Sequence, residues 1–168
     1  MPPLLENLWP LALLVALLAL VFWFGRRLLA EGPMPYEKRP SLLTPAELQF
    51  FAVLREVTDG LTIVAMVRLA DVIQVPSGTL KRQGWQNRIQ AKHLDFVLVD
   101  PATFEPRLAI ELDDSSHRRA DRAARDAFVD AALADAGLPL LRVNVARRYN
   151  AEELRKRIDE QTAAATHG

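Results

Sequence analysis

Three carboxylates near the ends of two predicted strands have the chemistry to hold a divalent cation. Asp95 lies in the apolar run of residues 94–99, and Glu111 and Asp113 lie in the run of residues 107–113. If the two runs pair so that Asp95 faces the same side as Glu111, strand alternation places Asp113 on that side too. Clustered carboxylates repel one another unless a cation neutralises them, and oxygen ligands suit Mg²⁺ or Mn²⁺. The alternative is that these acids lie at solvent-exposed strand ends without a ligand.

Several other catalytic chemistries lack the residues that they need. The 168-residue chain has no cysteine, which excludes disulfides and cysteine-ligated zinc or iron–sulfur sites. It has no glycine-rich phosphate-binding loop and no serine in a nucleophile elbow. Its 21 Lys and Arg residues balance its 21 Asp and Glu residues, which argues against coating nucleic acid by bulk charge and leaves room for a local basic groove. Carboxylates and histidine remain as candidate catalytic groups.

Two groups of basic residues are candidates for contact with a nucleic-acid backbone. Arg118 and Arg122 recur at helical spacing, although the aspartates between and after them equally suit an ion-paired, solvated helix face. The irregular segment 68–92 has basic residues with fewer acids nearby. These basic residues are Lys81, Arg82, Arg88 and Lys92. Trp85 in the same segment is either a stacking surface for a base or a core residue.

The elements that must position these groups follow from apolar periodicity and turn signals. The sequence Thr44-Pro45-Ala46-Glu47 predicts a helix start, because it combines a capping threonine, a proline at the first helical position and a capping-box glutamate. Helices are predicted at about 45–57, 118–136 and 150–161, and strands at 61–67, 94–99, 107–113 and 140–145. The soluble part is therefore predicted to be one α/β domain, in the order helix, three strands, helix, strand, helix.

The amino-terminal segment is predicted to be a membrane anchor. Residues 8–24 contain no charged side chain, and as a helix these 17 residues would rise about 25 Å. Trp9 and Trp23 lie at its two ends, where indoles favour the membrane interfaces. Arg26 and Arg27 follow the apolar run, which favours an uncleaved anchor over a cleaved signal peptide and predicts a cytoplasmic carboxyl-terminal side.

The predicted organisation is an anchor at 4–27, a linker at 28–41, a soluble domain at 42–161 and a disordered tail at 162–168. The linker sequence AEGPMPYEKRP holds three prolines and a glycine, which indicates a fairly stiff tether of at most about 35 Å. The domain is therefore expected to work close to the membrane.

Four linked motifs span most of the soluble part: KHLDFVLVD at 92–100, IELDDSSH at 110–117, RDAF at 125–128 and AGLPLLRV at 136–143. They resemble a bacterial family catalogued as domain of unknown function 2726, over roughly residues 42–145. That family resembles the restriction-endonuclease-like, or PD-(D/E)xK, superfamily. It is also similar to very-short-patch-repair endonuclease-like proteins, whose T-P-x-E helix, D-F strand, E-L-D-G-x-x-H turn and L-L-R strand recur here in the same order. The resemblance implies a restriction-endonuclease-like core.

The resemblance also implies roles for individual residues. It makes Asp95 the first acid of the superfamily motif, Glu111 the second acid and Asp113 the third position, and it adds Glu47 as the acid on the first helix. On this basis Asp95, Glu111 and Asp113 are the predicted ligands of Mg²⁺ or Mn²⁺. Glu47 has a competing structural role as the capping-box residue of its helix.

Asp113 departs from the superfamily pattern, which has lysine at this position to orient or deprotonate the attacking water and to stabilise the developing phosphorane charge. An aspartate supplies no positive charge. His117 is the expected replacement for the base, since its near-neutral pKa suits proton transfer and the patch-repair-like enzymes use a histidine shortly after the acidic strand. Lys92 and Arg142 are further candidates for the missing cation.

The leading hypothesis is a membrane-tethered, metal-dependent nuclease-like protein that hydrolyses phosphodiester bonds in nucleic acid, with DNA favoured over RNA. It would lie in the inner membrane through residues 8–24, with its amino terminus outside and its domain in the cytoplasm. The alternative is a catalytically inactive module of the same fold that binds nucleic acid or acts as a protein scaffold at the membrane. Aspartate at position 113 favours the alternative, whereas the acidic cluster next to His117 favours the enzyme.

Overall fold

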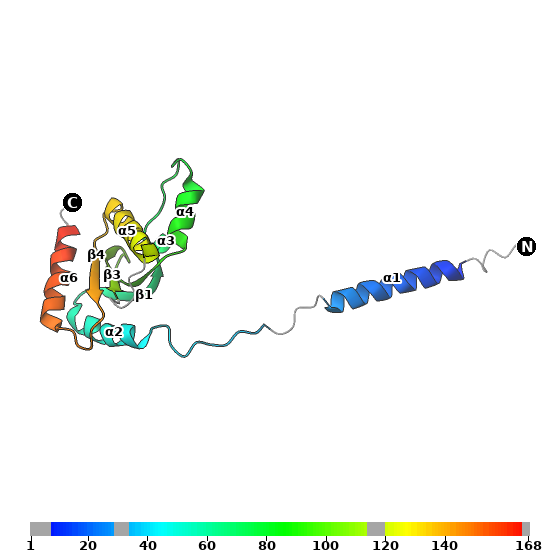
Figure 1. The fold of residues 1–168 in the computed structure, drawn as a ribbon, viewed down its shortest axis with the longest axis horizontal. Coiled ribbons are helices and arrows are strands. Elements are labelled where there is room, and N and C mark those ends of the chain that lie inside the picture. Colours follow the sequence, from blue (N-terminus) through cyan, green and yellow to red (C-terminus); the bar gives the residue numbers. More distant parts are fainter. Residues whose placement is uncertain (1–7, 29–33, 114–119, 166–168) are drawn as a thin grey trace, which may run out of the picture. The chain divides into compact units, whose positions relative to one another are not determined.

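The computed structural model describes residues 8–28, 34–113 and 120–165 and divides into two compact units, Met1–Pro40 and Ser41–Gly168. The first unit contains α1 (Trp9–Leu28). The second unit contains α2 (Pro45–Val57), β1 (Thr62–Arg68), α3 (Leu69–Val72), α4 (Arg82–Gln90), β2 (His93–Val99), β3 (Pro106–Asp113), α5 (Ala120–Asp135), β4 (Leu140–Asn144) and α6 (Ala151–Ala165) (Figure 1).

α1 has the length and composition of a membrane-spanning helix. Its segment Trp9–Arg27 has 19 residues and a mean hydropathy of 1.9, and no part of that segment is buried in the structure. The apolar side chains that a soluble helix would pack into a core are instead exposed here, as for Phe22, which is 68% exposed. The prediction of one apolar amino-terminal helix is confirmed at this level.

A four-stranded sheet in the order β1-β2-β3-β4 forms the centre of the second unit. β1, β2 and β3 are antiparallel neighbours, and β4 runs parallel to β3 after the crossover through α5. α2 and α6 pack on one face of the sheet, and α3, α4 and α5 pack on the other (Figure 1). The prediction of a mixed α/β fold is therefore confirmed, and the predicted order holds apart from two additional short helices, α3 and α4.

The two helices on the first face begin with the caps that the sequence predicts. The Thr44 hydroxyl accepts the Glu47 backbone N–H and the Glu47 carboxylate accepts the Thr44 N–H, so α2 begins with a complete capping box. At the start of α6, the Asn150 side chain accepts the backbone N–H groups of Glu152 and Glu153. α6 continues to Ala165, four residues past its predicted end, through an alanine-rich segment that favours helix.

α3 and α4 occupy the segment 68–92, for which the sequence predicts no regular structure. α4 has no side-chain cap, and its N-cap residue Lys81 has a left-handed backbone with φ of 56°. Gly84 lies inside the helix, and Ile89 is its single buried residue. The usual start signals and a broad apolar stripe are therefore absent from α4, which explains why periodicity does not reveal it.

Candidate functional site

β2 and β3 separate at the end of the sheet where the predicted carboxylates lie. Their antiparallel pairing ends at Phe96↔Ile110, after which β2 continues along β1 only and β3 along β4 only. The Asp95 side chain reaches across this opening, and its Oδ2 accepts the Leu112 backbone N–H at 2.8 Å. The residue that follows Ile110 is Glu111. We refer to Asp95 and Glu111 as the fork carboxylates.

Asp95 is a half-buried acid whose ionisation is unfavourable in this environment. Burial raises the pKa of Asp95, and the nearby negative charges of Glu47 and Asp113 raise it further. The Leu112 N–H and the guanidinium of Arg125 act in the opposite direction without reversing the shift. Four residues from α2, β3 and α5 therefore act on a single carboxyl group at the fork.

Glu111 is buried, with 9% of its surface exposed, and its ion pair with Arg142 joins Oε2 to Nη1 at 2.8 Å. Burial raises the pKa of Glu111, and the charges of Asp95 and Asp126 also raise it, while Arg142 and Arg125 lower it. Since the pKa stays above its ordinary value despite the ion pair, the cost of burying this carboxylate outweighs the stabilisation of its charge by the two arginines.

Arg142 on β4 is the central cation of this region. Besides Glu111, its guanidinium contacts the carboxylates of Asp113 at 3.0 Å and Asp130 at 2.8 Å. Burial alone would lower the pKa of Arg142, but the three carboxylates raise it, so the side chain is permanently charged. The backbone carbonyl of Arg142 in turn accepts a hydrogen bond from Arg157 of α6. Arg142 therefore joins β3, β4, α5 and α6 at one point.

Glu47 has the capping role that the sequence suggests, and its charge also acts on Asp95. Its carboxylate closes the capping box of α2, where Oε2 accepts the Thr44 N–H at 2.7 Å. The same charge raises the pKa of Asp95, so Glu47 lies within electrostatic range of the fork. A capping contact and a contribution to the site are thus compatible in this structure.

We expect Glu47→Gln to separate these two roles. Glutamine preserves a capping box, so the free energy of unfolding should change by less than about 0.5 kcal/mol. Because the variant removes a negative charge, the pKa of Asp95 should fall, as measured by carboxyl-carbon NMR titration of the full chain in detergent micelles. Thr44→Ala is the converse control: it should lose about 1 kcal/mol of stability and leave the pKa of Asp95 nearly unchanged. An Asp95 pKa that does not respond to Glu47→Gln would place Glu47 outside the site.

Part of the predicted site lies outside the described residues. This applies to His117 and Arg118, and to the side chain of Arg122, whose backbone belongs to α5. Among the residues that the structure describes, no three Asp, Glu or His side chains are grouped so that they could hold a metal ion. Of the predicted ligands, Glu111 and Asp113 both pair with Arg142, at 2.8 and 3.0 Å, and Asp95 accepts the Leu112 N–H, so a metal at the fork would share Glu111 with that arginine.

The predicted nucleic-acid contacts of the segment 68–92 divide into two groups. Arg88 and Lys92 pack against α5, with the Arg88 guanidinium 4.1 Å and the Lys92 ammonium 4.7 Å from the centre of the Phe128 ring. Lys81 and Arg82 are exposed at the start of α4. The structure therefore brings Arg88 and Lys92, but not Lys81 and Arg82, against the helix that also carries Arg125.

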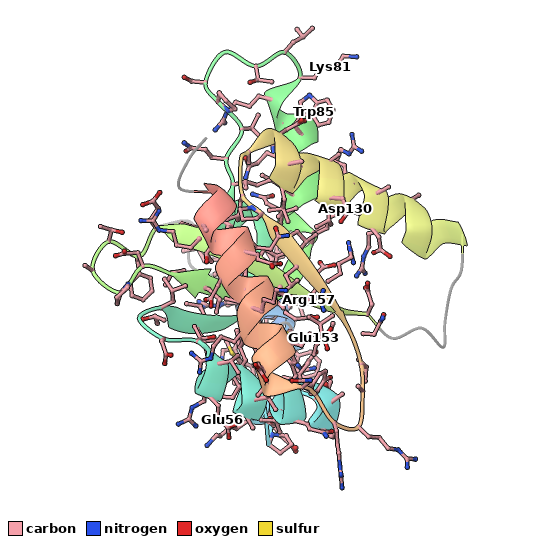
Figure 2. The ribbon with its side chains drawn as sticks, turned by 90° about the vertical axis from the view of Figure 1, so that its left-hand side faces the viewer. Glu56, Lys81, Trp85, Asp130, Glu153 and Arg157 are labelled. Atoms are coloured by element: carbon pink, nitrogen blue, oxygen red, sulfur yellow. The ribbon has the colours of Figure 1, made fainter. Side chains whose placement is uncertain are left out.

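A groove of about 600 Å³ follows the outer edge of β4, with Asp130 of α5 on one side and Arg157 of α6 on the other (Figure 2). Arg142 lines this groove, whereas Asp95 and Glu111 do not. The groove therefore reaches the central cation but not the fork carboxylates.

Sequence reasoning underestimated Arg142 and did not identify Asp126 or Phe128. The signal for Arg142 is its place in the strand LLRVN, where it is the one charged residue among apolar neighbours. A charged side chain in a buried strand requires an opposite charge, and the acids of the neighbouring strand supply it. Phe128 has no such signal, because an aromatic residue on a helix is normally read as core.

Residues 39–161 match the model of a family described as Protein of unknown function (DUF2726). Neither a curated protein nor a solved structure matches the chain.

Proposed function

The chain belongs to the family of unknown function DUF2726, and we propose that it is a membrane-tethered, metal-dependent nuclease-like protein that hydrolyses phosphodiester bonds. One observation carries the proposal: two desolvated carboxylates, Asp95 and Glu111, lie at the fork of β2 and β3, and both have raised pKa values. A divalent cation would offset the cost of ionising these two buried carboxylates. Mg²⁺ commonly binds through one or two carboxylates, with water and substrate phosphates completing its coordination, so two ligands are sufficient.

A restriction-endonuclease-like core is part of the proposal. The order of α2, the three antiparallel strands, α5, the parallel strand β4 and α6 supports it, as does the position of the acids where β2 and β3 separate. The resemblance of the E-L-D-D-S-S-H segment to the superfamily motif points to the same place. Fold resemblance alone does not define an activity, which is why the fork chemistry carries the argument.

The residues of the fork would each have a different role in hydrolysis. Asp95 is fixed by the Leu112 N–H and Glu111 by the Arg142 guanidinium, so both carboxylates are oriented before a ligand arrives. A bound cation would neutralise phosphate charge and lower the pKa of a coordinated water. Arg142 contacts Asp113 directly and would supply positive charge next to the position where the superfamily has lysine. His117 remains the predicted acceptor of the water proton.

Nucleic acid would approach along α5. Arg88 and Lys92 are held on the Phe128 ring of this helix, and Arg125, three residues before Phe128, is close enough to Asp95 and Glu111 to lower their pKa values. Cations at these positions favour binding of a phosphate backbone next to the fork. Arg122 of α5 remains a predicted contact, as does Arg118, which lies outside the described residues.

We also propose that α1 spans the inner membrane with its amino terminus outside. Arg26 and Arg27 lie in its last turn, and Lys38 and Arg39 follow in the linker. Basic residues near the end of a span favour the cytoplasmic side. The Arg27 guanidinium lies 5.3 Å from the centre of the Trp23 ring, a pairing suited to the headgroup region.

A second candidate is a catalytically inactive module that binds nucleic acid or protein. The contacts of Arg142 favour it, because this arginine already pairs with Glu111, Asp113 and Asp130. An internally compensated set of charges can serve stability or specificity without a metal. The two candidates differ in what the fork binds, which makes metal binding the first test.

We expect Mg²⁺ and Mn²⁺ to bind saturably to the full chain in detergent micelles, as measured by isothermal titration calorimetry. Asp95→Asn preserves the acceptor for the Leu112 N–H and removes the charge, so it should weaken metal binding at least about tenfold while the chain stays folded. Glu105→Gln is the matched control, since Glu105 is an exposed acid in the turn between β2 and β3. Absence of binding up to millimolar metal, with or without added nucleic acid, would favour the inactive module.

A further inference from the structure

The segment between Asp71 and Asp95 has a net positive charge. It contains Lys81, Arg82, Arg88 and Lys92 and no acidic residue, although acids and bases are equal in number over the whole chain. Such a segment attracts an anionic surface through local charge rather than through net charge. Of its four cations, Arg88 and Lys92 pack on α5, whereas Lys81 and Arg82 are exposed at the start of α4, where they can face a partner outside the domain.

The start of α4 is an ordered projection rather than a loose loop. The Thr79 hydroxyl donates to the Pro76 carbonyl at 2.9 Å, and the Arg82 backbone N–H donates to the Thr79 carbonyl at 3.2 Å. The Arg82 Nε donates to the Val75 carbonyl at 3.2 Å and joins the two sides of the turn. The turn therefore holds Leu80 in an outward position, where this side chain is 83% exposed.

Two apolar and two cationic side chains lie together on this projection. Leu80 precedes Lys81 and Arg82, and Trp85 follows one turn later with 46% of its surface exposed. Figure 2 places Lys81 at the outer end of the segment and Trp85 next to it along α4. We refer to Leu80, Lys81, Arg82 and Trp85 as the α4 tip. An aliphatic residue, an indole and two cations in one exposed turn match the composition of surfaces that bind at a membrane interface.

We propose that the α4 tip docks the domain on anionic phospholipid headgroups of the membrane that holds α1. Twelve residues, 29–40, separate α1 from the second unit, and they span at most about 40 Å when extended. A domain of about 130 residues has a radius of gyration of about 14 Å, so this tether keeps every face within reach of the bilayer. The tether raises the effective concentration of lipid, so a small tip suffices for docking.

Leu80 favours a lipid partner over nucleic acid at this tip. Leu80 offers no ring on which a base could stack, and the Trp85 ring already has the Arg88 guanidinium 4.9 Å from its centre. An aliphatic side chain gains directly from insertion between acyl chains. Lys81 and Arg82 would then contact lipid phosphates, and Trp85 would lie at the headgroup level. The inference is independent of hydrolysis at the fork and depends on α1 being in a membrane.

The absence of cysteine from the chain makes a spin-label experiment specific. Ser77→Cys places a single label next to the tip and preserves all four tip residues, and Ala102→Cys places the control label in the exposed turn between β2 and β3. The full chain is inserted into nanodiscs of phosphatidylcholine alone or with about 30% phosphatidylglycerol. Accessibility of each label to oxygen and to a water-soluble nickel complex then reports its depth.

We expect the label at position 77 to gain oxygen accessibility and lose nickel accessibility in the anionic discs only, and the label at position 102 to stay aqueous in both. Lys81→Glu changes the charge of the tip by two units, and each unit changes binding about fivefold. The ratio of docked to undocked domain should therefore fall about 25-fold. Lys156→Glu makes the same charge change on an exposed residue of α6 and should have no effect. The proposal would be overturned if the label at position 77 stayed aqueous in both kinds of disc or responded equally in both. It would also be overturned if only added nucleic acid lowered the accessibility of that label to nickel.

Discussion

The Glu111→Gln variant should hydrolyse nucleic acid about 10³-fold more slowly than the parent chain. The variant removes one of the two fork carboxylates, and a metal ion contributes several kcal/mol of transition-state stabilisation when it is properly held. Each 1.4 kcal/mol corresponds to about a tenfold change in rate, which gives three orders of magnitude for about 4 kcal/mol. The measurement is cleavage of end-labelled DNA and RNA, single- and double-stranded, by the full chain in Mg²⁺ or Mn²⁺ and in chelator.

The stability of the same variant distinguishes loss of catalysis from unfolding. Burial raises the pKa of Glu111, so the folded chain binds more protons than the unfolded chain at pH values just above the ordinary carboxyl range. The free energy of unfolding contributed by this group therefore falls as pH rises through that range, and it levels off above the raised pKa. Glu111→Gln has no such group, so its stability should fall less over the same interval in metal-free urea unfolding.

Glu105→Gln provides the matched control for both measurements, because Glu105 is an exposed carboxylate that pairs with Arg107 away from the fork. It should keep the activity and the pH dependence of the parent chain. Equal hydrolysis by the parent chain and by Glu111→Gln would assign the activity to a contaminant and remove the support for a catalytic fork.

Local signals in the sequence were sufficient for most of the fold. The capping box of Thr44 and Glu47 gives the start of α2 without reference to the rest of the chain, and the structure agrees at both ends of that helix. The alternation of residues 107–113 predicts β3, because one of its faces packs under α2 and α6 and the other under α5. Such patterns involve residues close together in the sequence, and the tertiary contacts of the folded chain agree with them.

The fork depends on contacts between residues far apart in the chain. The sequence therefore predicts which residues lie there but not where the strands separate or how the charges pair. Alternation predicts that Glu111 and Asp113 share a face, but the end of pairing at Phe96↔Ile110 depends on how two strands twist apart. The engagement of Asp113 by Arg142 likewise requires the parallel register of β3 and β4, which aligns Glu111 with Arg142. α4 is missed for a related reason, since Ile89 is its single buried residue and its contacts with α5 involve Arg88, a charged side chain.

Arg142→Met should lower the free energy of unfolding by about 3 kcal/mol. Methionine preserves much of the apolar part of the side chain, so the loss measures the charge rather than the volume. Without the guanidinium, the buried Glu111 loses its ion pair, and removal of one partner from a buried pair typically costs 3–5 kcal/mol. We take the lower value because about a quarter of the Arg142 side chain is exposed to water. Urea unfolding of the full chain in detergent, followed by circular dichroism, measures the change.

A double-mutant cycle assigns that loss to the fork. Glu111→Gln in the Arg142→Met background should recover at least about 1 kcal/mol, because a neutral amide needs no cation, and the coupling between the two positions isolates their ion pair. Arg68→Met is the control, since its ion pair with Asp71 is exposed and its loss should have little effect. If Arg142→Met were no more destabilising than Arg68→Met, the fork would hold its negative charge without this arginine. Protonation of a fork carboxyl or a bound metal would then supply the compensation, because Asp95 and Glu111 are too desolvated to be left as an unpaired pair of anions. Adding a chelator during unfolding distinguishes the two, since only the metal is removed by it.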